Sequence, residues 1–97
     1  LLSGQYTKAS RFDDDVRSTY NEGGSAREEF EQRMATVDQI KELVDASQMV
    51  STALQYVISD KTLPVAIPGA KSPEQAAMNA AAGADTLSDA EIARLRV

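Results

Sequence analysis

Histidine and cysteine are both absent from this sequence of 97 residues. Without cysteine, the chain forms no disulfide, no zinc–thiolate site and no thiol nucleophile. Without histidine, it lacks the commonest general base and the commonest ligand for transition metals. We therefore expect no metal site and no catalytic residue of these types. The lack of cysteine also fits a reducing compartment, so a cytoplasmic location is the expectation.

Long apolar runs and clustered basic residues are also missing. No stretch reaches the roughly 18 apolar residues that a membrane-spanning helix needs. The chain has 15 acidic and 10 basic residues, giving a net charge of −5. No basic stripe overrides that sign, so neither a nucleic acid nor a membrane is an expected partner.

Residues 25–45 are predicted to form a helix, because apolar residues recur three and four positions apart. Ser25 and Glu28 match a capping box at its start. A second helix is expected over residues 47–60, beginning at Ser47 and carrying a wide apolar stripe. The apolar face of the first helix is Phe30, Met34, Val37, Ile40 and Val44. The short connection predicts that the two helices pack as a pair.

Residues 1–24 show no periodicity and contain Gly4, Gly23 and Gly24, so we expect an irregular loop. An irregular stretch this long is unusual in a compact domain unless it serves a ligand. The acidic run at 13–15 is interpreted as a solvated turn, because a calcium site needs about 6–8 oxygen ligands from a shaped loop.

Residues 63–67 are predicted to form a short buried strand, followed by a Pro-Gly turn and a helix. Ser72 suits the N-cap of that helix, Gln75 completes a capping box, and Gly83 suits its end. Ser88 and Glu91 predict a capping box for a last helix. A single strand cannot satisfy its own backbone groups. Its partners must come from another chain or from sequence outside these residues; otherwise the segment is not a strand.

The start of the helix after the turn is a candidate phosphate site. A helix N-terminus presents unpaired N–H groups and a partial positive charge, and Lys71 and the Ser72 hydroxyl lie beside it. An ordinary strand-to-helix connection would have the same pattern, so both interpretations stay open on these residues alone.

The segment Val-Ala-Ile-Pro-Gly-Ala-Lys-Ser-Pro-Glu-Gln at 65–75, with Asn79 after it, resembles the third signature of aldo/keto reductases. The opening Leu-Leu-Ser-Gly-Gln-Tyr-Thr at 1–7 resembles the loop after strand seven of that family, and residues 87–91 resemble the start of its C-terminal helix. The resemblance implies the C-terminal part of a (β/α)8 TIM barrel. As an isolated segment this part is mostly α, with about four helices and one short strand. A complete barrel needs about 250 residues.

The resemblance also implies a division of the chain and an NADP(H) site. Residues 1–24 would be the cofactor-side loop, 25–60 the helical pair, 63–83 strand and helix eight with the phosphate clamp, and 87–97 the C-terminal helix. The 2′-phosphate of NADP would be held by Gly69, Ala70, Lys71 and Ser72, the adenine end by Gln75 and Asn79, and the pyrophosphate by Leu2, Ser3 and Gly4.

The family's catalytic Asp, Tyr, Lys and His belong to the N-terminal half of the barrel, so no residue here takes those roles. The first hypothesis is a C-terminal fragment of an NADP-dependent aldo/keto reductase, inactive alone and completed by the missing N-terminal barrel half. The second is a stand-alone, non-catalytic helical homo-oligomer that self-associates through apolar helix faces. A third is a nucleotide-binding module that keeps the NADP clamp without the chemistry.

Overall fold

The computed structural model describes residues 1–96. Across these residues the secondary structure is helical, and no strand is present. The mostly α character of this segment, expected from the sequence, is confirmed. Val97, the last residue of the expected C-terminal helix, lies outside the described residues. The elements are the 3-10 helices η1 (Arg17–Tyr20) and η2 (Ala46–Gln48), and the helices α1 (Arg27–Leu43), α2 (Met49–Ile58), α3 (Pro73–Ala82) and α4 (Asp89–Leu95).

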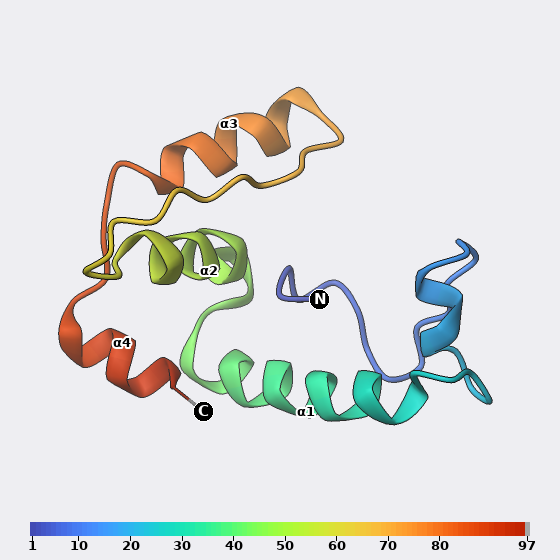
Figure 1. Ribbon diagram of the computed structural model, residues 1–97. Coiled ribbons are helices and arrows are strands. Elements are labelled where there is room, and N and C mark those ends of the chain that lie inside the picture. Colours follow the sequence, from blue (N-terminus) through green and yellow to red (C-terminus); the bar gives the residue numbers. More distant parts are fainter. Residues whose placement is uncertain (97) are drawn as a thin grey trace.

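The helices lie in tiers, with α1 along one side, α2 next to it and α3 beyond α2 (Figure 1). The strongest packing between helices joins α2 to α3, and α4 returns to contact α1. The Gln55 side-chain amide donates to the Ala82 carbonyl at 3.3 Å, and the Leu87 N–H donates to the Ser59 hydroxyl at 3.0 Å. The first bond joins α2 to the C-terminal end of α3, and the second joins the end of α2 to the segment that leads into α4.

The hydrophobic core lies between α1, the start of α2 and the opening loop. Phe30 and Met34 are fully buried on α1, and the apolar face predicted from the sequence points into this core. Phe12 comes from the loop and packs edge-on against Phe30, with ring centroids 5.7 Å apart. The buried cluster is Phe12, Phe30, Met34, Val37 and Met49. The opening loop is thus part of the core.

The predicted caps of the first two helices are wrong. Helix α1 begins at Arg27 after Ala26, with no side-chain cap from Ser25. A turn preceding α1 takes over this task, because backbone carbonyls accept from the N–H groups of Ala26 and Arg27 at 3.0 and 3.2 Å. Ser47 lies inside η2, and the carboxylate before it, Asp45, accepts from its N–H at 3.3 Å.

The predicted N-caps of the last two helices, Ser72 and Ser88, are confirmed. The Ser72 hydroxyl accepts from the Gln75 N–H at 3.1 Å, and Pro73 occupies the first turn of α3. At α4, the Ser88 and Glu91 side chains form the complete capping box. Gly83 is the C-cap of α3, with an ordinary right-handed φ of −71°. Each of these ends is therefore set by residues within a few positions of it.

The predicted strand at 63–67 is not formed. No other segment of residues 1–96 pairs with its backbone, which is the condition that a lone strand cannot meet. Leu63 also adopts a left-handed φ of 54°, which interrupts the run at its start. Leu63, Val65 and Ile67 are 81%, 84% and 94% exposed, while Pro64 and Ala66 between them are half-buried. The segment keeps the alternation of a strand without its pairing.

Replacing Phe30 with alanine is expected to lower the free energy of unfolding by about 3–5 kcal/mol, because the core loses a fully buried ring and gains a cavity. Denaturant unfolding followed by circular dichroism measures the change. Met78→Ala is the control, since this side chain is 53% exposed on α3 and is expected to shift stability by no more than about 0.5 kcal/mol. Equal effects of the two substitutions would contradict this placement of the core.

Candidate functional site

The turn at residues 68–71 lies beyond the N-terminal end of α3 (Figure 1). Ser72 follows it in an extended conformation and caps the helix, so the chain turns sharply into α3. The turn and the first residue of the helix are exposed. Pro73 has no N–H and the Gln75 N–H is bonded to Ser72, so the Glu74 N–H and the helix dipole are what this first turn offers a ligand beside the exposed Lys71.

Two side chains of α3 hold this turn in place. The Lys71 N–H donates to Oε1 of Gln75 at 2.8 Å, and Nδ2 of Asn79 donates to the Gly69 carbonyl at 3.2 Å. Gln75 and Asn79 are four residues apart, so they share one face of the helix. The predicted capping box is thereby corrected: Gln75 reaches back one residue further than Ser72, because the Lys71 N–H points toward the helix.

Other groups of the turn are available to a ligand. Among the described residues, no hydrogen bond acceptor is found for the N–H groups of Gly69, Ala70 and Ser72, and Lys71 is in no ion pair. Successive free N–H groups, a helix N-terminus and an ammonium form an arrangement that favours an anion such as phosphate.

A cavity of about 570 Å³ lies on the inner side of the turn, between α2, α3 and residues 64–70. Its size falls in the usual range of small-molecule sites, roughly 300–1,000 Å³. Asn79 supplies the polar side chain in a lining that is otherwise aliphatic, with Leu54, Ile58 and Val65 among its walls. The cavity therefore offers a ligand mostly apolar walls and one hydrogen-bonding side chain.

The second group of candidate residues is at the opening of the chain. Gly4 has a left-handed φ of 76°, and its N–H donates to the Leu1 carbonyl at 3.3 Å. The Ser3 hydroxyl accepts from the Gln5 N–H at 3.4 Å. Leu2 lines a separate cavity of about 530 Å³ with residues of α1, α2 and α4. A side chain at position 4 would be strained by this φ, so glycine suits this tight turn.

The structure brings the residues around α3 together but leaves the opening residues apart from them. The N-terminus lies near α1 and the start of α2, whereas the turn at 68–71 lies at the N-terminal end of α3 (Figure 1). Within residues 1–96 no hydrogen bond links these two groups. The candidate site is therefore the group Gly69, Ala70, Lys71, Ser72, Gln75 and Asn79, with Leu2, Ser3 and Gly4 as a second group.

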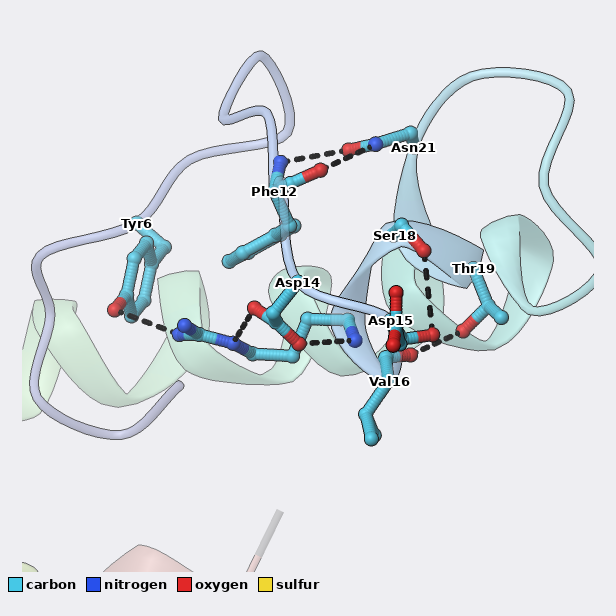
Figure 2. Close-up of polar contacts among 9 residues, drawn as sticks. Tyr6, Phe12, Asp14, Asp15, Val16, Ser18, Thr19 and Asn21 are labelled. Carbon is cyan, nitrogen blue, oxygen red and sulfur yellow. Dashed lines mark hydrogen bonds and ion pairs between the residues drawn. The ribbon is translucent and has the colours of Figure 1, made fainter.

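Sequence reasoning missed a set of contacts that order the opening loop (Figure 2). Asp14 accepts from the backbone N–H and from Nε of Arg17, both at 2.7 Å, and Nη1 of Arg17 donates to the Tyr6 hydroxyl at 3.2 Å. The signal in the sequence is the spacing of three between Asp14 and Arg17. The loop is thus an ordered structure around η1.

Within the acidic run at 13–15, the Asp14 carboxylate contributes to this order. The hydrogen bond from the Arg17 backbone N–H, aided by the Arg17 guanidinium, lowers the pKa of Asp14 below its ordinary value of 3.8. A lowered pKa stabilises the folded loop above that value, and the contribution is lost as the pH falls through the pKa of the folded state. Over the described part of the chain, no group of three or more acidic residues is placed to hold a metal ion.

Comparison with protein families gives one clear result. The profile of the Aldo/keto reductase family matches residues 1–97, the full length of the chain. The chain therefore belongs to the aldo/keto reductase family. Searches of curated proteins and of solved structures give no match. No helix within residues 1–96 has both the length and the apolar character needed to cross a membrane.

Replacing Gln75 with alanine is expected to speed hydrogen exchange of the Lys71 amide by about 2- to 12-fold, the usual net effect of losing one hydrogen bond. Amide exchange followed by nuclear magnetic resonance measures this rate. Gln32→Ala on the exposed side of α1 is the control, since that side chain bonds no part of the turn. An unchanged Lys71 rate in the Gln75 variant would contradict the bond.

Proposed function

We propose that this chain is the C-terminal part of an NADP-dependent aldo/keto reductase and supplies the 2′-phosphate and adenine side of the cofactor site. The parent enzyme transfers hydride between NADPH and an aldehyde or ketone. The observation that carries the proposal is the turn at 69–72, which is tied to α3 by Gln75 and Asn79. Family membership and this turn together support a cofactor clamp.

The chemistry of the turn suits the 2′-phosphate. That group is a dianion, and it would meet the Lys71 ammonium, the free N–H groups of Gly69 and Ala70, and the Ser72 hydroxyl. The N-terminal end of α3 adds a partial positive charge. Charge-assisted hydrogen bonds of this kind are about twice as strong as neutral ones.

The cavity beside the turn supports the placement of adenine. Its aliphatic walls match the faces of a purine, and Asn79 offers an amide to the ring edge. On binding, Asn79 would exchange its bond to the Gly69 carbonyl for one to adenine. Leu2, Ser3 and Gly4 would contact the pyrophosphate, which requires that the opening loop and the turn face a common cleft in the complete enzyme.

The missing N-terminal half of a (β/α)8 barrel is the partner that this proposal requires. It would supply the catalytic residues and the strands that pair with residues 63–67. The exposure of Leu63, Val65 and Ile67, together with their alternation, supports a covered position in a larger protein.

Replacing Lys71 with alanine is expected to weaken NADPH binding by about 10- to 100-fold, because one charge-assisted contact to a phosphate is lost. Binding of NADH, which has no 2′-phosphate, is expected to stay unchanged. Fluorescence titration with both cofactors measures the two dissociation constants. Lys61→Ala, which removes an exposed lysine outside the turn, is the control. Equal losses for NADPH and NADH would contradict the assignment of Lys71 to the 2′-phosphate.

A second candidate function is a non-catalytic homo-oligomer, and the bare apolar segment at 63–67 favours it. In that case the backbone of this segment pairs with its copy in another chain, and the outward Leu63, Val65 and Ile67 are covered.

Under this second candidate, analytical ultracentrifugation of the chain is expected to show an oligomer, and Val65→Lys is expected to shift it to a monomer, because a charge would then lie in the interface. Val16→Lys is the matched control, since Val16 is also largely exposed but lies next to η1. A well-folded monomer of the unaltered chain would refute this candidate.

A further inference from the structure

A cluster of contacts around Arg17 fixes the end of the opening segment. The guanidinium carbon of Arg17 lies 5.2 Å from the centre of the Phe12 ring, Nε bonds Asp14, and Nη1 donates to the Tyr6 hydroxyl at 3.2 Å. The Tyr6 ring also packs against Phe12, with centroids 5.3 Å apart. Tyr6 is therefore held from two sides, by its ring and by its hydroxyl.

Phe12, against which this cluster packs, is itself held in place by its ring and by its backbone. Its ring is buried against Phe30 of α1 and against Tyr20 at the end of η1. The Asn21 side chain bonds both backbone groups of Phe12, accepting from its N–H at 2.8 Å and donating to its carbonyl at 2.7 Å (Figure 2). Any group that rests on Phe12 thus has a fixed position relative to α1.

One residue, Gln5, separates the opening residues 2–4 from Tyr6 in the chain. On their inner side, the nearest side chains to Gly4 are Met49 and Lys41; a Cβ built on Gly4 would lie 3.5 Å from Cγ of Met49. Because Gly4 and Tyr6 are only two residues apart, a shift of Tyr6 moves the turn that contains Ser3 and Gly4. The bond from Arg17 to the Tyr6 hydroxyl therefore restrains the chain at the C-terminal side of this turn.

We propose that Arg17 and Tyr6 are positioning residues for the cofactor: together they hold Ser3 and Gly4 where these contact the pyrophosphate, without touching the cofactor themselves. This inference depends on the proposed function, because it assigns a role to residues that support one part of that cofactor site. The proposed cofactor site then has two regions. The opening loop would bind the pyrophosphate, and the turn at 69–72 would bind the 2′-phosphate.

Two probes separate these parts: NADPH, which has the pyrophosphate, and adenosine 2′-monophosphate, which lacks it. For the unaltered chain and for Arg17→Lys, Tyr6→Phe and the double variant, titration gives both dissociation constants. Each single variant is expected to weaken the binding of NADPH by about 3- to 10-fold, the effect of losing one hydrogen bond. The binding of adenosine 2′-monophosphate is expected to stay unchanged. The double variant is expected to bind NADPH no more weakly than Arg17→Lys alone, because Arg17→Lys already removes the bond to the Tyr6 hydroxyl.

Arg33→Lys is the matched control, since Arg33 pairs with Glu29 on the exposed side of α1 and does not reach the opening loop. Tyr6→Phe keeps the aromatic packing, so it tests the hydroxyl even if Arg17→Lys disturbs the fold, which circular dichroism checks. Additive losses in the double variant, or equal changes for both probes, would overturn the inference and leave the proposed function standing. If the unaltered chain binds neither probe, the proposed cofactor clamp fails for this chain, and the positioning role fails with it.

Discussion

The edge-on contact between Phe12 and Phe30 is the interaction on which the rest of the structure depends. Phe30 belongs to the apolar face of α1, and Phe12 belongs to a loop with little regular structure. Through Phe12 the loop gains a buried anchor, and Tyr6, Arg17 and Asn21 then organise around it. Aromatic pairs in this geometry stabilise beyond their buried area by about 0.5–1.5 kcal/mol. The core of this segment is thus shared between a helix and the loop that leads into it.

The turn before α3 follows a different principle, because it has no buried anchor. Hydrogen bonds from Gln75 and Asn79 hold it, and both come from the helix that the turn introduces. A turn held by its own helix keeps its shape without help from the distant core. The same bonds leave the Gly69 and Ala70 N–H groups without partners in the described chain, so the segment is ordered and still able to receive an anion. Local order of this kind reduces the entropy lost when a ligand binds.

Features formed by residues close together in the sequence could be predicted, and contacts between distant residues could not. The apolar spacing of Phe30, Met34 and Val37 predicted α1, and the Ser72 and Ser88 caps were predicted because each acts within one helical turn. The cap at Ser25 was wrong because carbonyls of the preceding turn satisfy the helix start, which no short motif reveals. Arg17 and Tyr6 meet across 11 residues of sequence, so their contact has no local signal. Of the candidate site, the sequence indicated the turn residues but not the bonds that hold them.

The segment at 63–67 separates the two functional proposals on physical grounds. Its residues alternate between half-buried and exposed, yet its backbone has no ladder partner among the described residues. Leu63, Val65 and Ile67 stay in water here, so this segment does not gain the free energy that burial of these apolar side chains would supply. In a barrel, neighbouring strands would pair with the backbone along both edges, and the packed barrel interior would cover the side chains on one face. A second copy of the segment would pair with one edge only and leave the other exposed. Pairing of both backbone edges and burial of the apolar side chains of residues 63–67 therefore favour the larger enzyme over the homo-oligomer.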